Sequence, residues 1–280
     1  MFSDDGKPLA VSIPDLFHKF PYDRLPSNGD NEHDYCNITS LFLRPEIMLL
    51  LIVLYVCHIP LLSALVRVTG FDGKRSKTLK WIVVLHNLAL ASFSAIVFVV
   101  VATKVLPSHL SRGFVDVIYC DKDGSFWNDG NGIGIWAFVF YISKYYEFLD
   151  TSILILKGKD PSFLQTYHHV GIACTMWGAI VSQSAWVHIV VVLNSFIHTL
   201  MYLYFLIKTI RPSMEIKAAK YLTSAQVLQF IIGIVYTFGV LVSNKCDTDA
   251  SRFVLAVIDI YAIGLILLFL MFAKRKYKKT

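Results

Sequence analysis

Two adjacent histidines, His168 and His169, begin an apolar segment and are the residues of this chain best suited to chemistry. A short distance before them, Lys144, Glu147 and Asp150 place three charges in another apolar segment. Ionisable side chains inside a membrane are costly, so they normally face a protein interior or a wet cavity and mark function. The two segments together predict a polar reaction chamber inside a helical bundle.

The charged segment forms one helical stripe, because Lys144, Glu147, Asp150 and Thr151 follow the spacing 0, 3, 6 and 7. Lys144 and Glu147 alone could be a simple intrahelical ion pair. Asp150 gives the stripe a net negative charge, which requires another partner. We expect the stripe to face polar groups on neighbouring helices.

The histidine segment presents two faces. Gln165 and His168 share one face, whereas His169 is turned about 100° away from His168. A membrane histidine often serves only as a hydrogen-bonding residue between helices. Beside an acidic stripe, however, a carboxylate can orient an imidazole and set its tautomer.

Two later apolar segments also carry polar faces. Asn194, His198 and Tyr202 share one helix face, and Gln226 and Gln229 lie three residues apart on the next segment. For the glutamines alone, hydrogen bonding between helices is the simpler interpretation.

The elements that must position these residues are membrane helices. The chain is 55% hydrophobic and only 16% charged, against about 25% charged residues in soluble proteins. Its apolar runs are continuous, as helices require, and do not alternate like barrel strands. We expect an all-α integral membrane protein, a seven-transmembrane helical bundle with spans near 46–66, 81–103, 135–156, 165–182, 186–210, 221–243 and 252–273. The third and fourth spans are the weakest, and this pair could be re-entrant or tilted.

The basic residues orient the bundle through the positive-inside rule. They concentrate at 67–80, at 208–220 and at the C-terminus, whereas the loop at 104–134 is slightly acidic. We therefore expect a lumenal N-terminal tail (1–45), a transmembrane domain (46–273) and a basic cytosolic tail (274–280). No cleavable signal peptide is evident at the polar N-terminus. Lys276 and Lys278 resemble a KxKxx retrieval signal, which favours the endoplasmic reticulum membrane, although a basic tail could equally be an anchor near anionic lipid.

Depth along the helices brings the polar faces together. At 1.5 Å per residue, Lys144 and His198 lie about 18 Å from the cytosolic helix ends, near the middle of the membrane. His168 and Gln226 lie about one turn inside the cytosolic surface. Four segments thus direct polar side chains into one layer that is open to cytosolic reagents.

Four motifs in this order resemble the ELO family of very-long-chain fatty acid elongases. Lys144 to Thr151 matches KxxExxDT, and Gln165 to His169 matches the histidine box in its QxxHH form. The NxxxHxxMYxYY motif begins at Asn194, with Phe205 in place of its last tyrosine, and TxxQxxQF begins at Thr223.

The resemblance implies a 3-oxoacyl-CoA synthase, an acyltransferase that condenses a long-chain acyl-CoA with malonyl-CoA and releases carbon dioxide and CoA. It also implies that the seven-transmembrane helical bundle encloses an acyl-chain tunnel. It implies no cofactor, no metal and no nucleic acid, and it leaves room for a homodimer and for contacts with other enzymes of the elongation cycle and with membrane lipid. The implied nucleophile is His168, with Gln165, Asn194 and His198 as oxyanion donors and His169 in a structural or separate role. Supporting roles fall to the residues around them: Lys144, Glu147, Asp150, Thr151, Tyr202, Gln226 and Gln229.

Two departures from the family pattern bear on the substrate and the chemistry. Many members have histidine where this chain has Gln165, so that position is better interpreted as a hydrogen-bonding residue. The QxxHH form resembles elongases of polyunsaturated acyl chains. Phe205 removes a hydroxyl group whose role we do not assign.

Two other functions fit parts of the pattern. A di-iron desaturase or hydroxylase requires several histidine boxes, whereas this chain has one HH pair and a distant His198; stoichiometric iron that tracks activity would favour it. A seven-helix receptor would share the expected topology, but the charged stripe lies on the cytosolic side and not in a lumenal ligand pocket.

The expected lumenal loops yield a testable covalent pattern. Asn37 begins an Asn-Ile-Thr glycosylation sequon. Cys120 and Cys246 fall in separate loops on the oxidising side, where a disulfide between them is plausible and Cys36 would stay free. Non-reducing peptide mapping should recover the Cys120 and Cys246 peptides joined. Three unpaired thiols, the open alternative, would give only single peptides.

Overall fold

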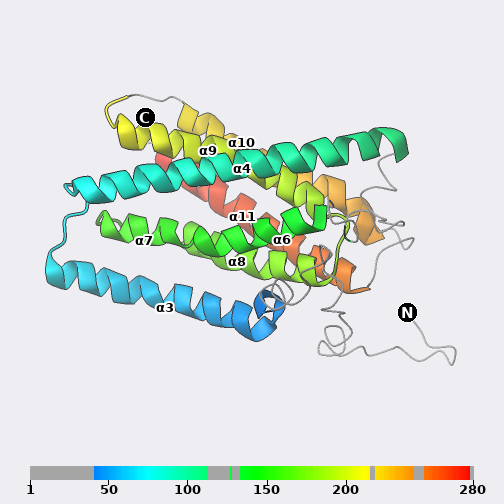
Figure 1. The fold of residues 1–280 in the computed structure, drawn as a ribbon, viewed down its shortest axis with the longest axis horizontal. Helices are drawn as coiled ribbons and strands as arrows, with labels where there is room; N and C mark the ends of the chain where they lie inside the picture. Colours follow the sequence, from blue (N-terminus) through cyan, green and yellow to red (C-terminus); the bar gives the residue numbers. More distant parts are fainter. Residues whose placement is uncertain (1–40, 113–126, 128–132, 215–217, 243–248, 278–280) are drawn as a thin grey trace, which may run out of the picture.

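The computed structural model describes residues 41–112, 127, 133–214, 218–242 and 249–277. Within these ranges the chain is a bundle of helices without a β-strand, which confirms the all-α prediction there (Figure 1). In chain order the helices are α3 (Pro45–Thr69), α4 (Lys77–Arg112), α6 (Ile133–Tyr146), α7 (Leu149–Leu156), α8 (Phe163–Val181), α9 (Val187–Ile210), α10 (Ala218–Val242) and α11 (Asp249–Tyr277). The predicted sequon at Asn37 and the predicted pair Cys120–Cys246 lie outside the described residues.

Within the described ranges, five helices are long and apolar enough to cross a membrane: Pro45–Thr69, Lys77–Pro107, Val187–Ile210, Ala218–Leu241 and Asp249–Tyr277. The predicted count of seven spans is therefore not confirmed. The two remaining predicted spans correspond to α6 with α7 and to α8, the helices that carry the charged stripe and the paired histidines. Among these, α8 lies at the centre of the bundle, in contact with α3, α6, α9 and α11.

The predicted span at 135–156 is divided into two helices. α6 ends at Tyr146 and α7 begins at Leu149, and the two follow one another in the same layer (Figure 1). At the break the backbone tightens to i→i−3 hydrogen bonds, from the Asp150 amide to the Glu147 carbonyl oxygen at 3.0 Å and from the Thr151 amide to that of Phe148 at 3.1 Å. The break carries no hydropathy signal, because the charged residues keep helical spacing across it.

The outer surface of the bundle is apolar. Large hydrophobic side chains are exposed on the membrane-length helices, among them Leu61 on α3, Leu85 on α4, Val235 on α10 and Ile260 on α11. In a bilayer such side chains face lipid chains, which costs them nothing. Exposure of apolar side chains around a polar interior is the arrangement expected of an integral membrane protein.

Two glycines shape the turn between α3 and α4. Gly70 ends α3 in the left-handed conformation (φ 64°), which an L-residue with a side chain rarely adopts. A Cβ atom on Gly73 would collide with the carbonyl oxygen of Leu156, the last residue of α7. The turn therefore lies against the end of α7, at the end of the bundle where α8 begins and α9 and α11 finish (Figure 1).

A buried hydroxyl network joins α8, α9 and α11 at the opposite end. Trp186 donates from Nε1 to the Ser251 hydroxyl at 3.0 Å, and Ser251 donates to Ser184 at 2.7 Å. Ser184 in turn lies 2.6 Å from the Ser182 hydroxyl. Because these groups are almost fully buried, each must find its partner within the protein.

Removal of the central hydroxyl should therefore destabilise the bundle. In Ser251→Ala the Trp186 N–H and the Ser184 hydroxyl each lose a buried partner, which we expect to cost about 1–3 kcal/mol. Thermal unfolding of the purified protein in detergent would show a lower midpoint. Ser224→Ala is the matched control, because Ser224 is exposed and bonds only to its own helix at Lys220; an equal loss in both variants would contradict the network.

Candidate functional site

The predicted chamber exists as a cavity of about 910 Å³ lined by α4 and by α7 to α11. The sequence-predicted residues that line it are His168, His169, His198, Glu147, Asp150, Gln165, Tyr202, Gln226 and Gln229. Lysines from the helix ends and loops also line it: Lys74, Lys80, Lys157, Lys159, Lys208 and Lys276. Partial burial, together with the neighbouring Lys159, lowers the pKa of Lys157. An anion bound beside Lys157 would favour its protonated form and oppose this shift.

A buried ion pair adjoins the cavity, with Glu147 in its lining and Lys144 beyond it. Lys144 Nζ lies 2.6 Å from Glu147 Oε1, and both side chains are at most 2% exposed. The ammonium also donates to Asn194 Oδ1 at 3.2 Å and lies over the Phe140 ring, 3.9 Å from its centroid. The ion pair is present, but it is not intrahelical, because Lys144 is on α6 and Glu147 lies in the break before α7; Asn194 of α9 contacts its ammonium.

The Lys144 contact also fixes the orientation of the Asn194 amide. Because Oδ1 accepts from the ammonium, the Nδ2 hydrogens of Asn194 point elsewhere. Asn194 lines a second, smaller cavity together with His168 and Gln229. Its amide is thus presented as a hydrogen-bond donor at the histidine site.

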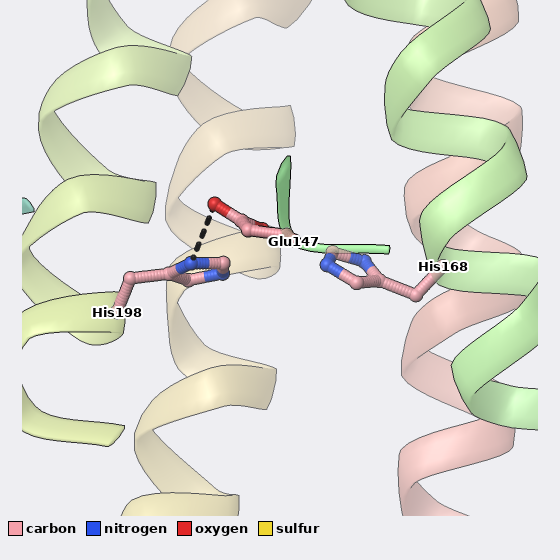
Figure 2. Close-up of side chains that lie close together, drawn as sticks. All are labelled: Glu147, His168 and His198. Carbon is pink, nitrogen blue, oxygen red and sulfur yellow. Dashed lines mark ion pairs between the residues drawn. The ribbon is translucent and has the colours of Figure 1, made fainter. Parts of the chain in front are cut away.

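Glu147 brings His168 and His198 together from two different helices. Figure 2 shows the carboxylate lying between the two imidazole rings, which come from α8 and α9. Glu147 Oε1 lies 3.5 Å from His198 Nδ1, and the ring centroids of His168 and His198 are 6.1 Å apart. The interval of 30 residues between these histidines is closed by packing of α8 and α9 around one carboxylate.

Asp150 makes its hydrogen bonds with Tyr202 and His86 and not with the paired histidines. It accepts a hydrogen bond from the Tyr202 hydroxyl at 2.6 Å, and its other oxygen lies 2.8 Å from His86 Nε2. Tyr202 in turn packs edge-on against His198, with 5.6 Å between ring centroids. Asp150 therefore acts on the site through Tyr202, from a position set by α4 and α9.

His86 is a chamber residue that sequence reasoning missed. It is 5% exposed, lines the 910 Å³ cavity and stacks on the ring of Tyr146. The signal that could have found it is the one used for the charged stripe, an ionisable side chain inside an apolar segment. It lies outside the four motifs, 58 residues before Lys144.

Gln165 holds the site together and does not reach the ion pair. Its Nε2 donates to Thr151 Oγ1 at 3.0 Å, and Thr151 lies 3.0 Å from the Tyr55 hydroxyl on α3. The three side chains connect α8, α7 and α3. The interpretation of Gln165 as a hydrogen-bonding residue agrees with this geometry.

His169 faces a different environment from His168, as helical spacing predicted. Its ring meets Tyr55 and Phe148 edge-on, at centroid distances of 5.7 and 5.8 Å. It is 4% exposed, and its Nδ1 has no hydrogen-bond partner among the described residues. The two rings both line the large cavity, with 5.6 Å between their centroids, but their other contacts differ.

The two glutamines of α10 line the opposite wall. Gln226 Nε2 donates to the sulfur of Met201 at 3.6 Å. Gln229 is 8% exposed, and its Oε1 has no partner within the described part of the chain. An unpaired buried amide oxygen beside a cavity is a group that a bound molecule can satisfy.

A narrow apolar cavity continues from the histidines. It measures about 60 Å³ and lies between α8, α9, α10 and α11, lined mainly by apolar residues such as Ile172, Leu193 and Ile258. His168 lines this cavity and the large one. The imidazole thus marks the junction between a lysine-lined polar chamber and an apolar slot.

The histidine site also contains ligand types that could hold a metal ion. One atom each of Glu147, His168 and His198 lies within 4.8 Å of the others. The same carboxylate, however, is paired through Oε1 with the Lys144 ammonium at 2.6 Å. A cation bound there would have to displace that ammonium or tolerate its repulsion.

Comparison with known proteins identifies the family of this chain. A family model described as the GNS1/SUR4 family, ELO, matches residues 40–280. The chain belongs to the ELO family. The match covers every described helix, so the five membrane-length helices and the three shorter ones all belong to the ELO region.

Several similar ELO proteins are named as elongases. Fatty acid elongase sre1 of Dictyostelium discoideum is 34% identical over 206 residues, 71% of this chain and 72% of the relative. A putative fatty acid elongase of the same organism is 31% identical over 263 residues, 90% of this chain and 84% of the relative. Long chain fatty acid elongase 2 of Caenorhabditis elegans is 32% identical over 199 residues, 69% of this chain and 70% of the relative.

The buried ion pair yields a stability test for this ELO protein. Lys144→Met leaves the Glu147 carboxylate buried without its cation, which should cost about 3–5 kcal/mol. The double variant Lys144→Met, Glu147→Leu should regain most of that loss, because an apolar pair needs no desolvation. Thermal unfolding in detergent measures both. Lys80→Met is the control, since Lys80 is exposed at the chamber; equal destabilisation of all three variants would contradict the assignment.

Proposed function

We propose that this protein is the condensing enzyme of fatty acid elongation, a 3-oxoacyl-CoA synthase that joins a long-chain acyl-CoA to malonyl-CoA. The observation that carries the proposal is His168 at the junction of the lysine-lined chamber and the apolar slot. An acyl-CoA has a polar CoA part and an apolar acyl chain, joined by the thioester. A group at the junction of a polar and an apolar cavity is therefore placed to meet the thioester carbonyl carbon. Family membership and relatives named as elongases support the same activity.

The chamber is suited to the CoA part of both substrates. Six lysines line it, and CoA carries phosphate groups that lysine ammoniums attract as point charges. Its volume of about 910 Å³ lies at the upper end of cavities that hold cofactor-sized molecules. The acyl chain would extend from His168 into the slot between α8, α9, α10 and α11 and widen it.

The first chemical step is attack of His168 Nε2 on the thioester carbonyl carbon. A C–N bond forms, the C–S bond breaks, and CoA leaves as a thiolate that takes a proton from water. The product is an acyl-imidazolium that keeps its proton on Nδ1. The carboxylate of Glu147, which lies between the His168 and His198 rings, stabilises this positive charge.

The second step forms the carbon–carbon bond. Malonyl-CoA loses carbon dioxide, and the released electron pair forms a bond from its α-carbon to the acyl carbon. The C–N bond breaks and its electrons return to Nε2, which regenerates the neutral imidazole. Overall, one proton is consumed and 3-oxoacyl-CoA, carbon dioxide and CoA are formed.

Asn194 and His198 are the donors nearest to the reacting atoms. The Asn194 amide presents its Nδ2 hydrogens, because Lys144 holds Oδ1. Its hydrogen bond, and one from the His198 ring, would strengthen as negative charge develops on the thioester oxygen. No metal ion is needed for this sequence, and Lys144 supplies the positive charge next to Glu147.

The finer assignments follow from the sequence. The basic ends of α9 and α11 and the lysine-lined chamber favour a cytosolic C-terminus in the endoplasmic reticulum membrane, where acyl-CoA and malonyl-CoA are met from the cytosol. The Gln165 form of the histidine box favours polyunsaturated acyl chains. Other enzymes of the elongation cycle would take the product, and a homodimer is compatible with the exposed apolar helices.

The covalent step gives the decisive experiment. The purified protein incubated with a long-chain acyl-CoA alone should gain the mass of one acyl group, and His168→Ala should gain none. Cys174→Ala is the control against a cysteine thioester, since Cys174 is a half-buried thiol of the same helix; it should retain the adduct. Acyl mass on His168→Ala would refute the nucleophile, and stoichiometric iron that tracks activity would favour a metalloenzyme instead.

A further inference from the structure

Tyr261, on α11, holds the imidazole of His168 from the side away from the chamber. Its hydroxyl oxygen lies 3.0 Å from His168 Nδ1 and 3.0 Å from the backbone oxygen of His168. Tyr261 belongs to none of the four motifs and follows His168 by 93 residues. The Tyr261 ring is 7% exposed, so water does not compete freely for its hydroxyl group.

The two contacts together fix where the protons lie. A phenol hydroxyl has one hydrogen to donate and lone pairs that accept. The backbone oxygen can only accept, so the phenol hydrogen points to it. The contact with Nδ1 is then a hydrogen bond only if Nδ1 carries a hydrogen and donates it to the phenol oxygen. In the neutral ring both contacts are satisfied only in this arrangement, which leaves Nε2 with a free lone pair.

We propose that Tyr261 is a positioning residue that selects the Nδ1–H tautomer of His168 and so makes Nε2 the reactive atom. Figure 2 shows the outer nitrogen of the His168 ring directed toward Glu147 and His198. A carboxylate opposite that nitrogen would by itself favour a proton on it, which would make it a donor and not a nucleophile. Tyr261 offsets this preference from the other side of the ring.

Packing of α8 against α11 holds the phenol in place. A Cβ atom on Gly171 would overlap the Tyr261 ring, so the ring occupies space that only glycine leaves open. The Tyr167 ring packs against the Tyr261 ring in a tilted arrangement at a centroid distance of 5.4 Å, and its hydroxyl donates to the Tyr261 backbone oxygen at 3.4 Å. The Tyr261 ring is therefore held beside Gly171, and its hydroxyl is held beside His168, one turn earlier on α8.

The proposal deepens the proposed function, because a free Nε2 lone pair is what thioester attack requires. Loss of the Tyr261 hydroxyl should leave the fold intact and lower the fraction of His168 in the reactive tautomer. Partners that orient histidines elsewhere change affinity or activity about ten- to hundredfold when removed. We expect a slowing of acylation in the same range.

Nitrogen NMR of the full-length protein labelled with ¹⁵N-histidine tests the tautomer without turnover. The His168 signals are assigned by their loss in His168→Ala. We expect Nδ1 to be protonated and Nε2 to be unprotonated, and Tyr261→Phe should move both signals toward those of a tautomer mixture. A protonated Nε2 with a bare Nδ1 in the unmodified protein would overturn the proposal.

Acylation kinetics test the consequence. Single-turnover formation of the acyl adduct should slow about ten- to hundredfold in Tyr261→Phe and also in Gly171→Ala, which displaces the phenol without removing it. Tyr221→Phe is the control, because it removes an exposed phenol hydroxyl from α10 that lines neither cavity. Acylation of Tyr261→Phe at the unmodified rate would overturn the proposal. If no variant forms an adduct while the NMR tautomer is as expected, the covalent step fails and the tautomer assignment stands.

Discussion

The buried pair of Lys144 and Glu147 is the interaction on which the rest of the chamber depends. Two charges at most 2% exposed inside an apolar bundle are tolerated only when each is matched, and the 2.6 Å contact supplies the main match. The ammonium also donates to Asn194, and the paired carboxylate oxygen lies 3.5 Å from His198 Nδ1, whereas the second oxygen of Glu147 has no partner among the described residues. One ion pair thus determines the position of two polar side chains on α9. The break between α6 and α7 falls at the same carboxylate.

Three layers of polarity follow one another along the bundle. Lysines mark the end at which α8 begins and α11 finishes, the histidines and carboxylates lie further in, and an apolar slot continues beyond His168. The sequence of layers matches the order of groups in an acyl-CoA, from phosphates through thioester to hydrocarbon. Hydrogen bonds of Gln165 to Thr151 and of Tyr202 to Asp150 keep the middle layer fixed between α3, α7, α8 and α9.

Much of this chamber was predictable because charge inside an apolar segment is conspicuous. Lys144, Glu147 and the histidines can be recognised because ionisable side chains are energetically costly inside a membrane. Helical spacing indicated that His168 and His169 point in different directions. The partners of Asp150 were not predictable, since no local pattern says which neighbouring helix a carboxylate faces. The division of 135–156 into two helices was missed for a related reason, because contacts with other helices decide it. Tyr261 is the extreme case, a single hydroxyl in an apolar helix whose importance depends wholly on what lies opposite.

The glycine at position 171 shows how far this dependence reaches. It has no functional group, yet the plane of a phenol from another helix fills the space beside it. A methyl group added there would overlap the Tyr261 ring and so displace the Tyr261 hydroxyl oxygen. The tolerance of position 171 is therefore set by the residue at 261, and the two should vary in concert among related sequences: wherever an aromatic side chain leaves the second position, the requirement for glycine at the first disappears.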